Sequence, residues 1–247
     1  MLNKFKNFII IILFLLPIFH TQNTFSQENN HFNTLIDNWF NSQDDFFKNS
    51  YISFVSKIGK EDVMVEGWSR IRASNDKLII GSSGVVWCSV ILGDEMDKLG
   101  YDAVAFGGVP DKYIRDWVKR IKKRYNKVIV FSGVNTLDIC SYYHYNNIDN
   151  EVYASIVDTL MEVSKNLLTK KGLLCYVKIK ERTEDDIPQY GIDGVNRYNE
   201  LANQLNYFLD EMKSVEKLTL NYPTDKRYSQ EYVHYYKKEV WEDLLTQ

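Results

Sequence analysis

Cysteine is scarce in this chain, and its placement argues against two ways of stabilising a small fold. The 247 residues contain 3 cysteines, Cys88, Cys140 and Cys175, an odd number at wide spacing. This spacing argues against a disulfide framework, and the lack of Cys-x-x-Cys or His-rich patterns argues against a metal site. We therefore expect no metal and no other cofactor. All three cysteines are interpreted as small buried side chains, with a reactive thiol as the alternative for Cys140.

An excess of charge of one sign is also lacking. The net charge is -3, and the 30 Lys and Arg residues are scattered, so no nucleic-acid partner is expected. The densest basic cluster, residues 119–124, is predicted to lie on the polar side of an amphipathic helix, as a solvated face rather than a phosphate site. No stretch rich in Gly, Pro or Ser divides the chain. Its length and 45% hydrophobic content predict one sizeable core.

Residues 1–26 are predicted to be a signal peptide. Two lysines within the first six residues precede an apolar run over 8–19, and Thr24-Phe-Ser26 offers small residues for cleavage. The run is shorter than the roughly 20 residues that span a bilayer. We expect a mature chain from about Gln27 that is secreted or lies at the cell surface, without a lasting membrane span. Retention as an anchor is the alternative.

Strand-like and helix-like patterns alternate along the rest of the chain. Strands buried on both faces are predicted at 77–80, 102–106, 128–131 and 173–179, with a weaker one at 217–220. Helical stripes are predicted over 114–125, 152–167 and 195–212, with Asp111 and Asn150 as N-caps. Strands that alternate with helices predict an α/β fold in which helices cover both faces of a parallel sheet.

Residues 27–76 precede the first predicted sheet strand. An amphipathic pattern over 32–40 predicts a helix, and residues 51–55 predict another short element. We interpret 27–76 as an N-terminal extension that packs on the domain formed by 77–247. The alternative is that its aromatic residues form a substrate wall.

Three of the predicted strands end in residues that suit acyl transfer. Ser82 and Ser83 follow the first strand, Gly107 the second, and Asn135 the third. The carboxyl ends of parallel strands meet at one edge of a sheet, where ligands bind. Near the C-terminus, Glu231-Tyr-Val-His234 adds an imidazole and a carboxylate. A hydroxyl, amide donors and a carboxylate-supported imidazole are the groups that catalysis through an acyl-enzyme needs.

In this order, the motifs resemble the four sequence blocks of the SGNH/GDSL hydrolases. Gly81-Ser82-Ser83 resembles the first block, and Gly107 stands where the second block has its glycine. Gly133-Val-Asn135-Thr136 resembles the third, and Glu231-x-x-His234 the fourth, followed by residues 235–241 that look like the terminal helix of the family. The resemblance covers roughly 77–245. It implies a three-layer α/β/α sandwich with a flavodoxin-like parallel sheet of about five strands.

The resemblance also implies a role for each site residue. Ser83 would be the nucleophile, His234 the general base, and Glu231 the carboxylate that orients the imidazole. The backbone N–H groups of Ser83 and Gly107 and the side-chain amide of Asn135 would form the oxyanion hole. These residues can also be read structurally, as an N-cap, turn glycines and a loop cap.

The chain departs from the family pattern at several supporting positions. Ser82 replaces an Asp, Ala105 an Asn and Thr136 an Asp, and Glu231 stands where Asp is usual. A serine triad with Glu in this role is chemically sound. Three further residues remain alternatives: Asp225 as the carboxylate, His144 as the base, and Asp138 as a replacement for the carboxylate missing at 136.

Three functions are compatible with these motifs. The resemblance favours a secreted serine esterase that removes an acyl group from a small ester or an acylated glycan, or an acyltransferase that uses the same acyl-enzyme step. The second is an extracellular binding module with the same fold and no turnover. The third uses residues 81–84 as a phosphate cradle in a flavodoxin-like protein.

Overall fold

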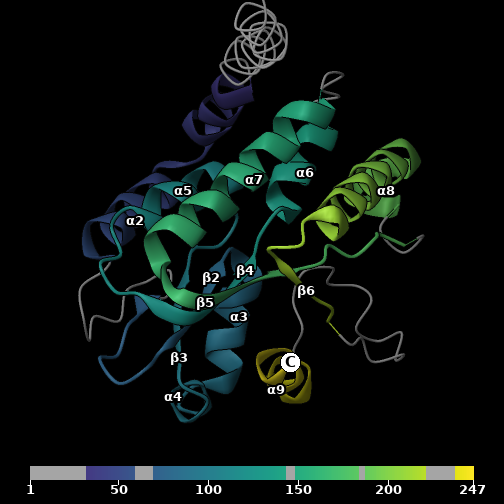
Figure 1. Ribbon diagram of the computed structural model, residues 1–247. Helices are drawn as coiled ribbons and strands as arrows, with labels where there is room; N and C mark the ends of the chain where they lie inside the picture. Colours follow the sequence, from purple (N-terminus) through teal and green to yellow (C-terminus); the bar gives the residue numbers. More distant parts are fainter. Residues whose placement is uncertain (1–31, 59–68, 143–147, 184–186, 221–236) are drawn as a thin grey trace, which may run out of the picture.

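A six-stranded sheet forms the centre of the computed structural model (Figure 1), which describes residues 32–58, 69–142, 148–183, 187–220 and 237–247. The predicted signal peptide lies outside these residues. The strands are β1 (Ser69–Arg70), β2 (Lys77–Gly81), β3 (Tyr101–Ala105), β4 (Tyr125–Phe131), β5 (Leu168–Val177) and β6 (Glu216–Leu218). All five predicted strands are confirmed, and β1 is an additional short one.

The strand order is β1-β3-β2-β4-β5-β6, and every pairing is parallel except that of β1 with β3. The five parallel strands follow the flavodoxin order, in which the first strand lies between the second and the third. The predicted α/β sandwich with a flavodoxin-like sheet is therefore confirmed.

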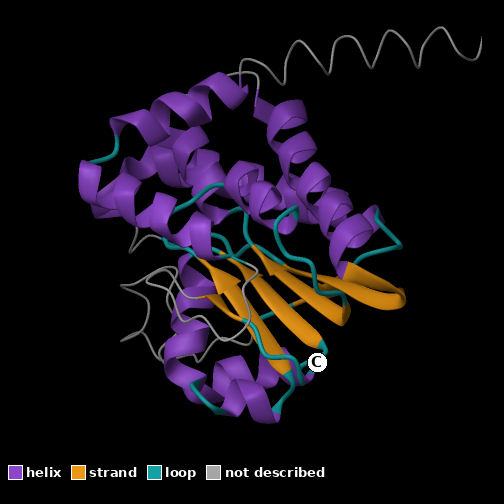
Figure 2. Cartoon of the chain, turned by 90° about the vertical axis from the view of Figure 1, so that its left-hand side faces the viewer, coloured by secondary structure: helices purple, strands orange, loops and turns teal. Residues whose placement is uncertain are grey.

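Helices cover both faces of this sheet (Figure 2). One layer contains a helix over 32–42, α2 (Asp45–Lys57), α5 (Asp111–Val118), α6 (Val134–Tyr142), α7 (Ile148–Leu167) and α8 (Ile187–Glu211). The smaller layer contains α3 (Ser83–Leu92), α4 (Glu95–Lys98) and α9 (Lys238–Thr246). Alternate side chains of a strand pack against opposite helical layers. In β2, Leu78 and Ile80 belong to one buried cluster and Ile79 belongs to the other.

Helix boundaries correct four sequence predictions. Helix α5 ends at Val118, and Tyr125, predicted on the same helical stripe, begins β4 because it pairs with Leu168. Residues 119–124 therefore connect α5 to β4 and do not lie on a helical face. The N-cap of α5 is Pro110, since Asp111 turns its side chain into the core. Helix α7 begins at Ile148, so Asn150 is not its N-cap.

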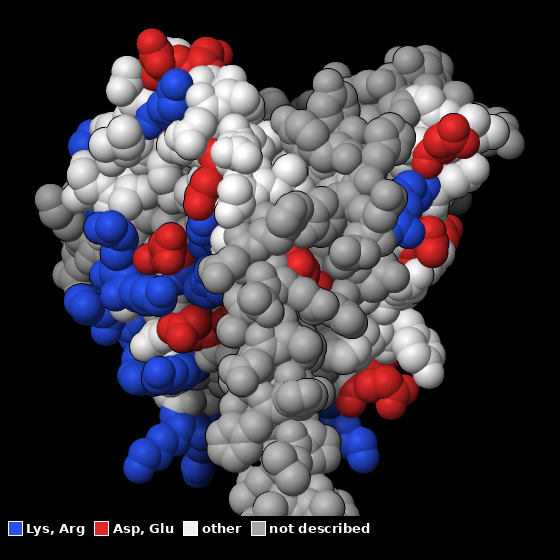
Figure 3. All heavy atoms as spheres, turned by 90° about the horizontal axis from the view of Figure 1, so that it is seen from above, with Lys and Arg blue, Asp and Glu red and all other residues white. Residues whose placement is uncertain are grey.

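Basic side chains of residues 119–124 have partners within the protein. Lys123 binds the buried carboxylate of Asp102, and Arg124 donates to the carbonyl oxygens of Lys165 and Leu168. On the face seen in Figure 3, Lys and Arg gather along one flank with Asp and Glu among them.

The three cysteines are free and buried, as predicted. Burial raises the pKa of the Cys140 thiol to about 12, which disfavours the reactive thiolate form. Within the described residues, no helix is both long and apolar enough to cross a bilayer.

Candidate active site

The register of three neighbouring strands brings the candidate residues to one edge of the sheet. Gly81, near the end of β2, pairs with Ala105 of β3 on one side and with Phe131 of β4 on the other. Two residues further along each strand lie Ser83, Gly107 and Gly133. The chain leaves β2 towards the smaller helical layer and leaves β4 towards the larger one. A divergence of this kind is where open parallel sheets bind ligands.

Ser82 and Ser83 occupy different environments. Ser82 is the N-cap of α3, and although its side chain is only 4% exposed it makes no capping hydrogen bond. Its backbone N–H donates to the carbonyl oxygen of Phe131 (3.3 Å), which ties the turn to β4. Ser83 is the first residue of α3 and is partly exposed. Because the first N–H groups of a helix have no partner inside the helix, Ser83 presents both a hydroxyl and an N–H at this edge.

Two glycines allow the turn to approach β4 closely. A Cβ atom on Gly81 would lie 2.0 Å from the carbonyl oxygen of Phe131, and one on Gly84 would lie 2.3 Å from the ring of Phe131. Either contact would force neighbouring atoms to shift. The small residues around Ser83 are therefore required by packing as well as by the turn.

Gly107 lies directly beside Ser83. A Cβ atom placed on Gly107 would be 3.9 Å from the Cβ of Ser83, with no nearer neighbour. The next residue, Gly108, has φ +78°, a left-handed conformation that favours glycine. The structure thus brings Ser83 and Gly107 together at the ends of β2 and β3.

Asn135 contacts the loop that carries Gly107. It is the second residue of α6, and its side-chain Nδ2 donates to the carbonyl oxygen of Val109 (3.1 Å). Since an amide NH₂ has two protons, one N–H remains after this bond. Gly133, two residues earlier, has φ +95°, and a Cβ there would lie 2.6 Å from the Tyr176 hydroxyl oxygen. This conformation turns the chain from β4 into α6 beside the Gly107 loop.

Asp111 is a part of this edge that the sequence interpretation missed. Its carboxyl is fully buried and shares a hydrogen bond of 2.5 Å with the Thr136 hydroxyl, between Oδ2 and Oγ1. Its backbone N–H donates to the same Thr136 oxygen (3.0 Å). The available signal was an Asp after Pro110 together with a Thr where the family pattern has an Asp, but Asp111 was interpreted as an N-cap.

Asp138 has a different partner. It forms an ion pair with Arg182, whose side chain is 4% exposed and stacks over the Tyr198 ring at 4.1 Å. This pair joins α6 to the segment after β5. Asp138 therefore does not occupy the place of the carboxylate that is missing at 136.

The remaining predicted site residues lie outside the described part of the chain. These are His234 and Glu231, and the alternatives Asp225 and His144. Among the described residues, no cluster of three His, Cys, Asp or Glu side chains could hold a metal ion.

Solved structures with a similar fold are known, although no family model and no curated protein matches the sequence. A GDSL-like lipase from Bacteroides thetaiotaomicron superposes with a TM-score of 0.56 at 10% identity, over 81% of this chain and 95% of that one. A Bacteroides fragilis protein assigned as an acylhydrolase gives 0.56 at 12% identity, over 83% and 97%. At 10–12% sequence identity, these superpositions show a shared fold and nothing more specific. Strand order, helical layers and superposition agree that this chain has the SGNH/GDSL hydrolase fold.

Proposed function

We propose that this chain is a serine ester hydrolase with Ser83 as its nucleophile. The observation that carries the proposal is the position of Ser83, partly exposed at the start of α3 and beside Gly107. A hydroxyl in this position can attack a carbonyl whose oxygen lies near the N–H groups of Ser83 and Gly107 and the Asn135 amide. Such donors stabilise the negative charge that develops on that oxygen in the transition state.

His234 is proposed as the base, and the course of α9 supports this. Trp241 of α9 packs against Phe131 at the end of β4 (ring centroids 6.0 Å apart), while Leu245 accepts a hydrogen bond from Tyr101 at the start of β3. Helix α9 therefore runs antiparallel to the strands, with its first residue, Lys238, towards the edge that holds Ser83. His234 precedes Lys238 by four residues in the sequence. Four residues of extended chain can span up to ~13 Å.

The proposed reaction has two stages. His234 accepts the Ser83 proton as the hydroxyl oxygen bonds to the ester carbon, and it then returns the proton to the leaving alcohol. Glu231 is proposed to orient the imidazole. Water next attacks the acyl-enzyme with His234 again as the base, which releases the acid and restores Ser83. An acyltransferase would differ in the second stage, where another alcohol replaces water.

A small acyl ester, such as an acetylated glycan, is proposed as the substrate. An aromatic side chain of the N-terminal helices lies next to the Gly107 loop, because the Phe47 ring is 3.6 Å from the Cβ position of Gly108 and contacts Phe106 edge-on. Rings of this kind can stack on a sugar. Release of acetate from a panel of acetylated polysaccharides would test this substrate class.

A labelling experiment tests the proposed function. The purified chain is treated with a fluorophosphonate probe and, separately, with p-nitrophenyl acetate. Wild-type protein and Ser82→Ala should react with both, whereas Ser83→Ala should react with neither. Absence of labelling and turnover in the wild type would favour the binding module, and a bound flavin absorbance would favour the phosphate cradle.

Asn135→Ala separates the oxyanion role from a structural one. Loss of one such donor typically lowers kcat about 100- to 1000-fold. Loss of the hydrogen bond to Val109 should lower stability by only about 1 kcal/mol. Kinetics with p-nitrophenyl acetate and thermal unfolding of the same sample measure the two effects, and wild-type kcat in the variant would argue against the role.

Export is proposed from residues 1–26. Expression of the full chain in a bacterium with a secretion pathway should yield a mature protein that begins near Gln27. N-terminal sequencing distinguishes this from a retained anchor.

A further inference from the structure

The edge that carries Ser83 contains a buried acid for which the proposed reaction has no use. Asp111 lies at the start of α5 with 0% exposure. Its Oδ2 is hydrogen-bonded to Thr136, but among the described residues its Oδ1 has no hydrogen-bond partner, and neither does the Ser132 hydroxyl. A buried polar atom without a partner costs about 1–3 kcal/mol of stability. Unsatisfied groups of this kind call for an explanation and are frequent at functional sites.

Asp111 and Thr136 connect the two segments that carry the proposed oxyanion donors, the Gly107 loop (106–110) and the start of α6 (134–136). Asp111 directly follows the loop with Gly107, and Thr136 directly follows Asn135. Thr136 Oγ1 accepts from the Asp111 N–H (3.0 Å) and is bonded to the Asp111 carboxyl (2.5 Å). The bond from Asn135 Nδ2 to the Val109 oxygen lies beside them (3.1 Å). Three hydrogen bonds thus join these two segments.

The surroundings of the Asp111 carboxyl favour its neutral form. Burial raises the pKa of Asp111, and the Ser132 and Thr136 hydroxyls and the N–H groups of Asp111 and Gly133 oppose this rise. The Ser132 hydroxyl therefore lies next to this carboxyl. A neutral carboxyl can both donate and accept a hydrogen bond, as the amide of Asn can.

Asp138, the other carboxylate near Asn135, cannot take this role because it is paired with Arg182. Where the family pattern has an Asp at 136, this chain has Thr136, whose hydroxyl is hydrogen-bonded to the carboxyl of Asp111 at the start of α5.

We propose that Asp111 is a positioning residue that acts through Thr136: together they hold the Gly107 N–H and the Asn135 amide at the spacing one carbonyl oxygen requires. The proposal rests on the proposed function. Neither residue touches the reacting atoms, so their loss should misplace the donors without removing them. Because donors of this kind act on the transition state, the effect should fall on kcat rather than KM.

Two threonine substitutions of equal size provide the test. Thr136→Val removes the hydroxyl that joins the two segments. Thr159→Val removes an equally buried hydroxyl that donates to the Asp111 backbone oxygen (3.3 Å) and does not join them. With p-nitrophenyl acetate, Thr136→Val should lower kcat about 10- to 100-fold with little change in KM, the size expected for misplaced groups. Thr159→Val should leave kcat unchanged, and Thr136→Ser and Asp111→Asn should retain most of it.

Hydrogen exchange of the same variants gives a readout that does not depend on turnover. Thr136→Val should accelerate exchange in peptides covering 106–110 and 132–136 together, whereas Thr159→Val should leave both unchanged. Equal kcat for the two valine variants, or acceleration confined to 132–136, would overturn the inference. If the wild type neither turns over ester nor labels at Ser83, the proposed function fails, and exchange alone decides whether Asp111 and Thr136 couple the two segments.

Discussion

At the scale of single residues, the glycines around Ser83 serve two purposes that a substitution can separate. Gly84 is in contact with the Phe131 ring, where a Cβ would lie 2.3 Å away, whereas Gly107 has free space up to the Ser83 Cβ at 3.9 Å. Gly84 is needed for packing against Phe131. Gly107 leaves room beside Ser83, the proposed nucleophile.

Alanine should therefore mainly lower stability at position 84 and mainly lower activity at position 107. Gly84→Ala should lower stability by about 1–3 kcal/mol through overpacking. Gly107→Ala should unfold at nearly the wild-type temperature but lose ester turnover, because its methyl group occupies the space beside Ser83. Thermal unfolding and p-nitrophenyl acetate kinetics measure both, and full activity of Gly107→Ala would argue against this site.

Asp111 should make stability depend on pH. Its pKa is raised in the folded protein, so the folded state binds more protons than the unfolded state, whose Asp titrates near ~3.9. Stability should then fall as pH rises from about 4 through the folded pKa. The neighbouring Tyr176 and Cys140 do not titrate in this range, because burial raises the pKa of both.

Asp111→Asn lacks this titration. The free energy of unfolding of the variant minus that of the wild type should become more positive as pH rises over this range. Urea unfolding of both proteins at several pH values measures the difference. A difference that stays constant with pH would show that Asp111 does not titrate as inferred.

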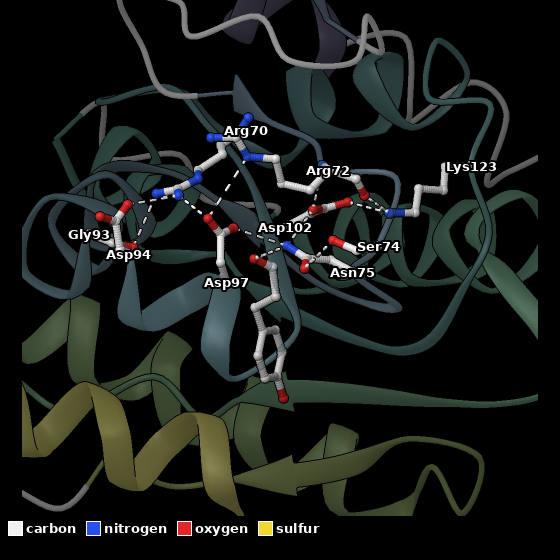
Figure 4. A network of polar contacts seen from close by, with 10 residues as sticks. Arg70, Arg72, Ser74, Asn75, Gly93, Asp94, Asp97, Asp102 and Lys123 are labelled. Carbon is white, nitrogen blue, oxygen red and sulfur yellow. Dashed lines mark hydrogen bonds and ion pairs between the residues drawn. The ribbon is translucent and has the colours of Figure 1, made fainter.

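At the scale of elements, the opposite end of the sheet is held by a polar network around β3 (Figure 4). The buried carboxylate of Asp102 accepts hydrogen bonds from the Arg72 N–H, Asn75 Nδ2, Lys123 Nζ and the Tyr125 hydroxyl, at 2.9–3.0 Å. These groups come from the segment before β2, from the connection that precedes β4 and from Tyr125, the first residue of β4. The network therefore fixes the amino ends of three neighbouring strands, and with them the register that aligns Ser83, Gly107 and Gly133.

Substitutions in this network should lower the stability of the fold and leave kcat unchanged. Asp102→Ala leaves several buried donors unpaired and should cost about 2–4 kcal/mol. Asp94→Ala is the matched control, because its pair with Arg70 is exposed and worth about 0–1 kcal/mol. Urea unfolding measures both. At a temperature where Asp102→Ala remains folded, its kcat should equal that of the wild type, and an unchanged unfolding midpoint would contradict the role of the network.

At the scale of the whole molecule, the N-terminal helices are part of the core. The Trp117 indole N–H donates to the Tyr51 hydroxyl (3.1 Å), and Phe54 packs edge-on against the same indole. Phe106, directly after β3, contacts Phe47, Tyr51 and Phe54. The helices over 32–57 thus cover aromatic side chains that lie directly behind the Gly107 loop.

A chain that begins at residue 69 should therefore fail to fold stably. Re-exposure of several large aromatic side chains at about 1.5–3 kcal/mol each is comparable to the whole stability of a domain. A chain that begins at residue 28 is the control and should unfold like the mature protein. Circular dichroism during heating distinguishes them, and a cooperative transition at the wild-type temperature in the shorter chain would contradict this packing.

Local patterns predicted the strands better than the ends of the helices. Four apolar runs and one weaker one became β2 to β6, because a strand buried on both faces must be continuously apolar. The helical stripe through Tyr125 was misleading, since a buried aromatic residue can satisfy helix periodicity and still begin a strand. Asp111 misled for a related reason. The preference of Asp for N-caps is local, whereas its bond to Thr136 joins residues 25 positions apart.

The sequence by itself determined the order of strands and helices, and with it the edge to which Ser83, Gly107 and Asn135 belong. Both follow from hydrophobic periodicity and from the rule that parallel strands share one carboxyl edge. Tertiary structure decided which groups meet at that edge. That Gly107 lies against Ser83, that Asn135 donates to Val109, and that Asp111 rather than Asp138 joins Thr136 all depend on strand register and on the packing of helices distant in sequence. Contacts of this kind are set by the three-dimensional arrangement, which no local pattern encodes.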